Sequence, residues 1–590
     1  MQSLPRPAGS IIRLTRALRH PRSIRILARN ARPASPSSAR LASSSNIIPS
    51  SRHLYRDSSS TPARNYSSAA AHQSRTLGET STAPPPVSEP GLEGWETVIG
   101  LEIHAQIRTD HKLFSASRTS FEEEPNTNVV PFDAGFPGTL PVLNRQAVDL
   151  TVSTALALNC TINPRSTFDR KHYFYHDIPA SYQITQHYNP IATEGKIELS
   201  PDLDPTLDRD VTVRIQQIQI EQDTAKTTKL ADGSTHIDLN RAGMGLMEIV
   251  TEADMRSPKE AGAFIRKLQA LLRRIKASDG DMEKGSMRVD ANVSIHRTGT
   301  PFGTRCEIKN LNSVRFMMAA LDNERRRHLK HYLDKPDVPL RQETRGFDEA
   351  KGETFTLRTK EEAEDYRYMP DGNLGPIVIL PGYLESIRRS LPELPDDVRR
   401  RLPEQYGVSL ADTEVLLSMD DVEGSGVAYF EEVVGNDQSR DGKQAVNWIV
   451  NELLGRLARK NEIWTWDRVP PQTLSSLLAL VETGEMTGTA AKNLLKHLLE
   501  QATITADTDI KLLATQMGLV AAGDSGADTL AELCRAVIEK LPAEAESVRK
   551  GKEKVVMRLV GQVMKDSKGT ADAKKAREVL LSMLVGEASS

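Results

Sequence analysis

Alternation of apolar and polar residues along the chain predicts four β-strands that each carry one polar face. The first strand ends at residue 106, the second covers 211–223, and the third and fourth form a hairpin over 286–310 with a turn near Thr298–Gly303. Their polar faces hold acids, bases, amides and one imidazole: Glu102, His104, Gln106, Gln219, Glu221, Asp223, Arg288, Asp290, Asn292, Ser294, Arg305, Glu307 and Lys309. A single such hairpin is typically a solvated sheet face, but here the pattern recurs in three separate segments.

Five of these side chains point to metal chemistry if the four strands share one sheet: Glu102, His104, Glu221, Asp290 and Glu307. Carboxylates that converge repel one another unless a cation lies between them. Oxygen ligands with one imidazole suit Mg²⁺ or Mn²⁺ better than a thiol-seeking metal. A histidine on a strand is also commonly structural, so the pattern alone leaves both a metal site and an ordinary polar face open.

Two segments between the predicted strands are less regular. Residues 169–186 are dense in Lys, Tyr, His and Gln, which is typical of a binding loop but also of an ordinary exposed aromatic loop. In residues 238–250, Gly243 and Gly245 permit a close approach of the backbone to a ligand, or simply a turn. Ser257–Glu260 is a capping box, and the apolar stripe that follows predicts a helix to Ile275 that backs the sheet.

The C-terminal third has the texture of helices. Leu391–Pro395 indicates a linker, and residues 396–515 show helical stripes such as Leu474, Leu477, Leu478 and Leu480. In residues 516–590 we expect two amphipathic helices separated at Lys568–Asp572. A basic run occupies this last segment and indicates either a solvated helix face or a nucleic-acid contact: Lys550, Lys552, Lys554, Arg558, Lys565 and Lys568.

The first 90 residues differ from the rest of the chain. No acid precedes Asp57, and arginines punctuate a stretch rich in Ser, Ala and Pro, which predicts a mitochondrial transit peptide, with a generic disordered tail as the alternative. The net charge of -3 over 590 residues excludes a global basic field. Three widely spaced cysteines suit a reducing compartment, and the absence of a long apolar run predicts no membrane insertion.

Several long motifs resemble the GatB family, the B subunits of glutamyl-tRNA(Gln) amidotransferases, in a mitochondrial form. They are Trp95–Gln106, Pro137–Asn144, Tyr173–Tyr175 with Tyr182–Ile184, Asp238–Val250, Gly285–Ser294 and Glu307–Ser313. The resemblance implies an α+β fold: a glutamine-synthetase-like cradle domain with a mixed or antiparallel sheet over 91–390, an all-α helical domain over 391–515 and a small helical YqeY-like tail over 516–590.

The family's chemistry is implied with the resemblance. The cradle uses ATP and Mg²⁺ to phosphorylate the glutamate of Glu-tRNA(Gln), and ammonia then displaces the phosphate to give Gln-tRNA(Gln). The expected partners form a heterotrimer with this chain in the mitochondrial matrix. They are an A-type amidase (glutaminase) subunit, which releases ammonia from glutamine, and a small third subunit of C or F type. The tail is expected to contact tRNA through Lys550, Lys552, Lys554 and Arg558.

Roles for individual residues follow from the same resemblance. We expect Glu221, Asp290 and Lys309 to be catalytic. ATP is assigned to Lys171, Arg288 and Asn310, and the metal to Glu102, His104, Glu221 and Glu307. The chain also departs from its family. Residues 129–135 lack the cysteines that hold zinc in some relatives, so no structural zinc is expected. Gln222 replaces the second acid of an acidic pair, and His176 replaces a proline.

Three classes of function remain open on the sequence. The leading one is the ATP-dependent amidotransferase subunit. A tRNA-binding scaffold without catalysis is disfavoured by the clustered carboxylates, and a glutamine-synthetase-like ligase for a small substrate is disfavoured by the basic tail. Cys306 falls on the apolar face of its strand and is expected to pack in the core. Cys160 and Cys534 have no histidine close in sequence, which leaves a base only from elsewhere in the fold, so the sequence shows no evident nucleophile for releasing ammonia from glutamine.

Overall fold

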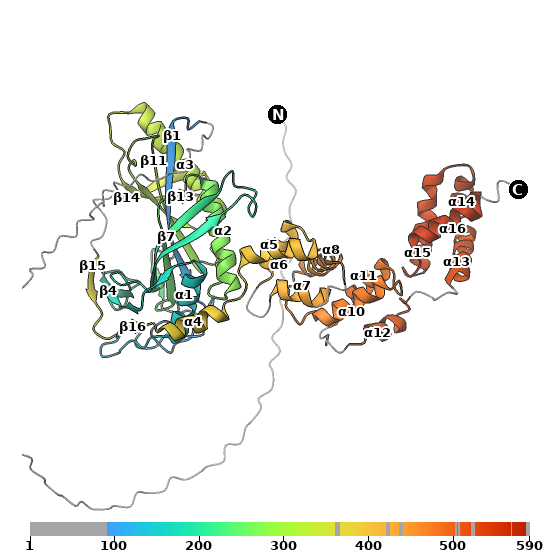
Figure 1. Ribbon diagram of the computed structural model, residues 1–590, viewed down its shortest axis with the longest axis horizontal. Coiled ribbons are helices and arrows are strands. Elements are labelled where there is room, and N and C mark those ends of the chain that lie inside the picture. The colour runs from blue at the N-terminus through green and yellow to red at the C-terminus, as the bar shows by residue number, and fades with distance from the viewer. Residues whose placement is uncertain are drawn as a thin grey trace, which may run out of the picture. The chain divides into compact units, whose positions relative to one another are not determined.

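The computed structural model describes residues 91–359, 366–420, 425–435, 440–501, 504–505, 508–520, 526–567 and 569–585. The predicted transit peptide, residues 1–90, and Lys568 lie outside these ranges. Within them, a sheet-rich region that extends to about residue 390 is followed by a region made of helices (Figure 1). This order confirms the expectation of an α+β region followed by an all-α one.

A nine-stranded sheet dominates the first region, in the order β14-β13-β12-β11-β1-β10-β7-β6-β2. Neighbouring strands are antiparallel except β12 and β13, which are parallel. The bounds are β1 Trp95–Gln106, β2 Thr161–Ile162, β6 Ala192–Leu199, β7 Val211–Gln222, β10 Gly245–Thr251, β11 Met287–Arg297, β12 Cys306–Leu311, β13 Glu343–Asp348 and β14 Glu353–Thr359.

The four predicted strands are β1, β7, β11 and β12, but a fifth strand separates two of them. β10 lies between β1 and β7 and consists of the second half of the segment that we interpreted only as a glycine-containing stretch. The part of that stretch before β10 contains a turn, in which Gly243 has a φ of +84° that favours glycine. The short run Leu-Met-Glu-Ile-Val after Gly245 is therefore a central strand, buried almost throughout.

A smaller three-stranded sheet, β15-β4-β5, lies beside the polar face of the large one. Its strands are β4 Asp169–His172, β5 Tyr182–Thr185 and β15 Arg367–Pro370. Side chains and backbone of β5 and β7 are hydrogen-bonded, for example Gln219 Nε2 to Thr185 Oγ1 at 3.3 Å and the Ile184 amide to Gln222 Oε1 at 3.4 Å. The segment 169–186 is thus a hairpin with a connecting loop, where the sequence suggested a loop throughout. Two further pairs are β16 Ile377–Val378 with β3 Arg165–Ser166, and β8 Lys226–Lys229 with β9 Thr235–Asp238.

Helices cover the apolar face of the large sheet: α1 Arg145–Ala157, α2 Pro258–Arg274 and α3 Val314–Asp334 (Figure 1). Ile99, Leu101 and Ile103 of β1 are buried in this core with Phe264 and Leu268 of α2. Full burial of each such side chain contributes about 1.5–3 kcal/mol. The predicted cap of α2 is present, because Ser257 Oγ accepts from the Glu260 amide. With the apolar face closed in this way, the opposite face keeps its polar side chains.

The first helix after residue 380 packs against the core of the sheet region through Ile387, and the later helices enclose two further apolar cores, one between Val398 and Leu519 and one between Cys534 and Leu584. In chain order, these helices are α4 Pro381–Ser390, α5 Pro395–Tyr406, α6 Leu410–Ser418, α7 Gly426–Val434, α8 Gly442–Asn447, the π-helix η2 Trp448–Leu454, α9 Gly455–Arg459, α10 Pro471–Glu482, α11 Gly488–Leu498, α12 Ile510–Gln516, α13 Gly526–Lys540, α14 Pro542–Arg549, the 3-10 helix η3 Glu553–Val555, α15 Val556–Asp566 and α16 Ala573–Val585.

The described residues of the last segment form four α-helices, α13 to α16, where we predicted two. α13 ends at Lys540 and α14 begins at Pro542, because proline cannot continue a helix but suits its first position. The predicted break near Lys568–Asp572 does separate α15 from α16. Among the described helices, none has a stretch long and apolar enough to cross a membrane.

Candidate active site

The polar face of the large sheet carries a row of four side chains on neighbouring strands. In the strand register, Arg288 of β11 lies opposite His104 of β1, and His104 lies opposite Glu248 of β10. Glu248 in turn lies opposite Gln219 of β7, whose amide donates to Glu248 Oε2 at 2.6 Å. Side chains directly opposite on adjacent antiparallel strands are close neighbours, so this row brings a base, an imidazole, an acid and an amide together.

Glu102, His104 and Glu248 form a compact cluster of possible metal ligands. Their donor atoms lie within 4.8 Å of one another, and His104 Nε2 is 3.6 Å from Glu102 Oε1 and 3.8 Å from Glu248 Oε2. Burial, together with Arg288, Lys171 and Lys309, lowers the pKa of His104 to about 3, which keeps its ring neutral and its lone pair available. Burial and neighbouring carboxylates raise the pKa of Glu248. Two carboxylates that repel one another without a cation, next to one neutral imidazole, fit a hard divalent ion.

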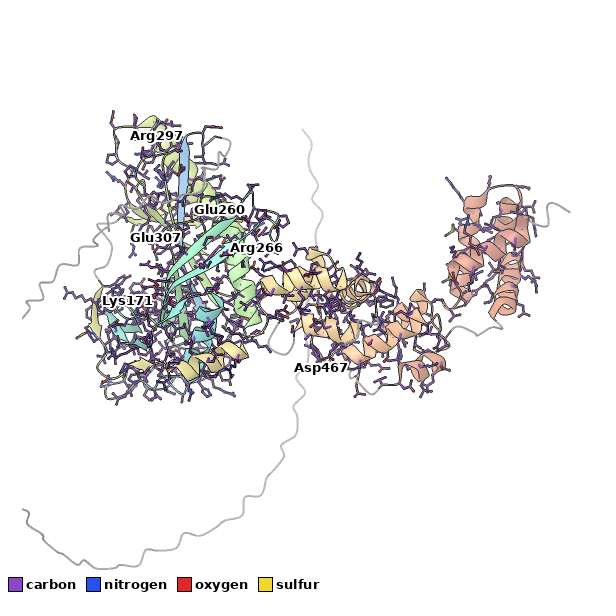
Figure 2. The ribbon with its side chains drawn as sticks, in the orientation of Figure 1. Lys171, Glu260, Arg266, Arg297, Glu307 and Asp467 are labelled. Carbon is purple, nitrogen blue, oxygen red and sulfur yellow. The ribbon has the colours of Figure 1, made fainter. Side chains whose placement is uncertain are left out.

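Glu221 lies beside this cluster with its own partners. It is 3% exposed, accepts a hydrogen bond from Gln183 Nε2 at 2.7 Å, and has Lys171 Nζ at 4.0 Å from its other oxygen. Burial alone would lower the pKa of Lys171, but Glu221 and further groups raise it, so the ammonium stays charged. Lys171 comes from β4 of the small sheet and reaches the face of the large one (Figure 2). Glu221 therefore joins the two sheets electrostatically.

Two further cations of this face are held by acids. Lys309 Nζ lies 2.5 Å from Asp290 Oδ2 and 3.2 Å from Glu307 Oε1. Burial would lower the pKa of Lys309, but these carboxylates raise it. Arg288 donates to Asp223 Oδ1 at 2.9 Å, which raises the guanidinium pKa further. Both groups are thus permanently positive at neutral pH, as phosphate binding requires.

A β-bulge shapes the end of β12 nearest to these cations. Val289 pairs with Leu311 and Ala291 pairs with Ile308, so Lys309 and Asn310 together stand opposite Asp290. Asn310 has a φ of +61°, in the left-handed region that asparagine tolerates better than most residues. The bulge leaves Asn310 exposed while Lys309 contacts Asp290.

The structure brings most of the sequence-predicted residues to one face but groups them differently. Of the four predicted metal ligands, Glu102 and His104 are in the compact cluster, Glu221 is bound to Gln183, and Glu307 pairs with Lys309 and accepts from Thr344 Oγ1 at 3.0 Å. The third member of the cluster, Glu248, was missed. Its signal was a single acid within the apolar run Leu-Met-Glu-Ile-Val, which is typical of a buried functional strand.

A cavity of about 380 Å³ adjoins this face at Glu102. Its lining comes from the strands β1, β7, β10 and β11 and from the loop before β12, and includes the polar residues Asn292, Ser294 and Arg305. Phe302 adds an apolar surface. This volume is within the range of cavities that bind small-molecule ligands.

The three cysteines are buried thiols. Burial raises the pKa of Cys160 to about 12 and that of Cys306 to about 11. Cys306 is fully buried as expected, but it adjoins a buried polar network in addition to apolar side chains. Within that network, Glu324 Oε1 is 3.0 Å from His328 Nε2, and Glu324 Oε2 is 3.2 Å from Arg345 Nε. The Glu324 carboxylate therefore forms internal ion pairs with the guanidinium groups of Arg327 and Arg345.

The predicted tRNA-binding residues Lys550, Lys552, Lys554 and Arg558 are all exposed, at the end of α14 and up to the start of α15. Lys550 lies 3.4 Å from Glu546 and Arg558 lies 3.8 Å from Glu544. Surface pairs of this kind are weak, so both side chains can exchange their partner for a phosphate at little cost.

Comparison with known proteins identifies the family of the chain. Residues 97–385 match the family model of the GatB/GatE catalytic domain, and residues 428–584 match that of the GatB domain. A protein of Cryptococcus neoformans, named as the mitochondrial B subunit of glutamyl-tRNA(Gln) amidotransferase, is 55% identical over 84% of this chain and 95% of its own length. The protein of the same name from Laccaria bicolor is 47% identical over 84% of this chain and 93% of its own length. A Rhizobium meliloti protein, named as the B subunit of aspartyl/glutamyl-tRNA(Asn/Gln) amidotransferase, is 41% identical over 84% of this chain and 96% of its own length. With both family models matched in order and relatives that align over most of their length, the chain belongs to the GatB family.

Proposed function

We propose that this chain is the B subunit of a mitochondrial glutamyl-tRNA(Gln) amidotransferase, a ligase that forms a carbon–nitrogen bond on mischarged Glu-tRNA(Gln). The observation that carries the proposal is the compact cluster of Glu102, His104 and Glu248 with Lys171, Arg288 and Lys309 on the same sheet face. Carboxylates that can hold a metal cation, next to lysine and arginine side chains that can bind phosphate oxygens, suit a phosphoryl-transfer reaction. The chain thereby serves mitochondrial protein synthesis.

The glutamyl side chain must be activated because oxide is not a viable leaving group. An oxygen of its γ-carboxylate attacks the γ-phosphorus of ATP, the bond between that phosphorus and the bridging oxygen breaks, and ADP leaves. The product is an acyl phosphate whose carbonyl carbon is a good electrophile. Ammonia then attacks this carbon, phosphate departs with the electron pair of the carbon–oxygen bond, and one proton is lost from nitrogen. The product is Gln-tRNA(Gln).

The residues of the polar face contribute position and charge to these steps. Glu102, His104 and Glu248 would hold Mg²⁺, with Glu221 next to them, and a bound Mg²⁺ neutralises charge on the transferred phosphoryl group. Lys171, Arg288 and Lys309 supply the remaining positive charge, with Asn310 on the bulge as a polar contact. Their acidic partners keep them charged and oriented until phosphate oxygens take the place of those partners. The cavity at Glu102 provides room for the nucleotide next to these groups.

Ammonia must come from a partner. Release of ammonia from glutamine requires an activated nucleophile, and thiols whose pKa is raised by burial are not thiolates at neutral pH. We therefore assign this step to an A-type amidase subunit, in a heterotrimer completed by a small third subunit of C or F type. Ammonium has no lone pair for attack, so a passage that excludes water between the partners would preserve free ammonia.

The remaining regions would bind the tRNA. Three separate apolar cores support a catalytic cradle over 91–390 with a glutamine-synthetase-like fold, a helical domain over 391–515 and a YqeY-like tail over 516–590. In the tail, the exposed Lys550, Lys552, Lys554 and Arg558 would contact phosphates of the folded tRNA. No structural zinc is assigned to the chain.

Trapping of the acyl phosphate tests this function. Hydroxylamine converts an acyl phosphate into a hydroxamate, so the assembled complex with ATP, Mg²⁺ and Glu-tRNA(Gln) but without glutamine should form hydroxamate at the γ-carboxyl of glutamate. Hydroxylamine also cleaves the ester to tRNA and gives α-hydroxamate, so only the ATP-dependent γ-hydroxamate is counted. ADP should form in equal amount. Omitting ATP or using uncharged tRNA gives the background.

The outcomes separate the three classes of function. Hydroxamate formed from free glutamate as efficiently as from Glu-tRNA would indicate a small-molecule ligase. No γ-hydroxamate in either case, from a complex that still binds tRNA, would indicate a scaffold. For the ammonia source, the chain without its partners should form little Gln-tRNA with ammonium salt and none with glutamine. Robust glutamine-dependent product from this chain alone would contradict the assignment to a separate amidase.

A further inference from the structure

A wall of aromatic rings stands on the small sheet and the loop that follows β5. It consists of Tyr173, Tyr366, Tyr368, His187 and Tyr188, which we call the aromatic wall. The rings of His187 and Tyr368 stack at 3.8 Å with an angle of 12°, and Tyr188 meets Tyr368 edge-on at 6.3 Å. Tyr173 and Tyr366 form a second edge-to-face pair at 5.2 Å. The five rings thus come from three separate segments and form two groups, whose members Tyr366 and Tyr368 are two residues apart in the chain.

The aromatic wall borders the catalytic face. Lys171, which lies 4.0 Å from Glu221, places its Nζ 4.9 Å from the centre of the Tyr366 ring and pairs in register with Tyr368. The Tyr173 hydroxyl donates to Gln183 Oε1 at 3.3 Å, and Gln183 donates to Glu221. The wall is therefore one side chain away from the carboxylates at which the reaction is proposed to occur.

Aromatic side chains continue from the wall toward solvent. Tyr188 is 58% exposed, and the loop after β4 adds Phe174 at 88% and Tyr175 at 53%. Exposed rings gathered in one place are uncommon on a soluble surface without a ligand. Lys171 lies on the same side of the small sheet as Tyr368, because the two pair in register, whereas the exposed Arg367 turns to the opposite side. Rings interleaved with bases are the features of proteins that bind unpaired nucleic acid.

We propose that the aromatic wall stacks against the unpaired 3′-terminal bases of the aminoacylated tRNA and thereby places the glutamyl ester at the catalytic face. This inference rests on the proposed function. The glutamate is esterified to the terminal ribose, so the terminal adenine must lie beside the carboxylates whenever the γ-carboxylate reaches them. Several exposed rings in sequence suit several successive bases, whereas ATP offers one. Lys171, which pairs in register with Tyr368 and therefore lies on the same side of the small sheet, is placed to contact a phosphate beside these bases.

Binding of uncharged tRNA to the assembled complex, without ATP, tests the stacking apart from the chemistry. Two ligands are compared, the intact tRNA and the same tRNA trimmed of its unpaired 3′ nucleotides. For the wild-type complex, we expect trimming to weaken binding about tenfold, which corresponds to about 1.4 kcal/mol. Tyr188→Leu removes the ring but keeps most of its bulk. It should weaken the binding of intact tRNA by a similar factor and leave the binding of the trimmed tRNA unchanged.

The matched control is Tyr188→Phe, which keeps the ring and should bind both ligands as the wild type does. As a direct readout, 2-aminopurine in place of the terminal adenine should lose fluorescence on binding to the wild type and to Tyr188→Phe, but much less on binding to Tyr188→Leu.

Two results would overturn the proposal. One is an equal loss of affinity for intact and trimmed tRNA in Tyr188→Leu. The other is a loss of ATP affinity with unchanged tRNA affinity, which would assign the wall to the base of the nucleotide. Because binding is measured without turnover, either result can coexist with hydroxamate formation, so failure of this inference is distinguishable from failure of the proposed function.

Discussion

Glu248→Gln should have opposite effects on stability and on activity. The amide keeps the shape of the carboxylate and can still accept from Gln219, so packing on β10 is preserved. What disappears is one negative charge in a cluster whose donor atoms lie within 4.8 Å of one another. Two unit charges at that distance repel by about 3.5 kcal/mol at an effective dielectric constant of about 20. Because burial raises the pKa of Glu248, part of this repulsion is already relieved by protonation.

Without metal, we therefore expect the variant to gain about 1 kcal/mol of stability, or a few degrees in melting temperature. With Mg²⁺ we expect the wild type to melt at a higher temperature than the variant. A ligand that binds the folded state stabilises it by RT ln(1 + [L]/Kd), so Mg²⁺ should raise the melting temperature of the wild type and much less that of the variant. Loss of one ligand removes a few kcal/mol of transition-state stabilisation, hence activity falls on the order of a hundredfold.

The assay is thermal unfolding of the assembled complex in EDTA and in increasing Mg²⁺, with the hydroxamate assay run in parallel. Glu198→Gln is the matched control, because it removes the same charge from the same sheet at a side chain that is 67% exposed. If Glu248→Gln melts lower than the wild type in EDTA and keeps activity within about threefold, Glu248 is a structural acid and the assigned metal cluster is wrong.

Three further predictions concern other parts of the chain. Glu221→Gln should lower the rate of Glu-tRNA-dependent ATP cleavage on the order of a hundredfold. The fold should persist, because the amide oxygen still accepts the hydrogen bond from Gln183. Rates within about threefold of the wild type would contradict a catalytic role. Removing residues 516–590 should weaken tRNA binding more than nucleotide binding and flatten its salt dependence, and an unchanged salt slope would exclude phosphate contacts by the tail. Glu324→Gln should cost about 3–5 kcal/mol of unfolding free energy at neutral pH, because it removes the buried carboxylate that pairs with Arg327, His328 and Arg345, although Arg345 keeps Glu343 as a partner. Burial would raise the pKa of Glu324, but its hydrogen bonds to His328 and Arg327 lower it below 4.5. The wild type therefore holds this stability above about pH 4.5 and loses it as pH falls through the folded-state pKa, whereas Glu324→Gln should lack that step in an acid titration of the melting temperature.

The period-two pattern was sufficient to predict which strands have a polar face and which side chains share it. A strand turns successive side chains to opposite sides, so Glu102 and His104, or Asp290 and Arg288, must lie together whatever the fold. Local chemistry likewise predicted the start of α2 at Ser257, because a cap depends on residues within one turn. The expected core position of Cys306 followed from the same alternation.

The order of strands in the sheet was decided by the tertiary structure. Pairing joins residues far apart in the chain, and nothing in the period of a strand specifies its neighbours. β10 separates β1 from β7, so Glu248 and not Glu221 completes the cluster with His104, while Glu307 is drawn into an ion pair with Lys309. The aromatic wall has the same origin, because β4 and β15, nearly 200 residues apart, are brought together by hydrogen bonds that only the folded chain can make. Sequence determined which side chains each strand offers, and the long-range pairing of strands determined which of them meet.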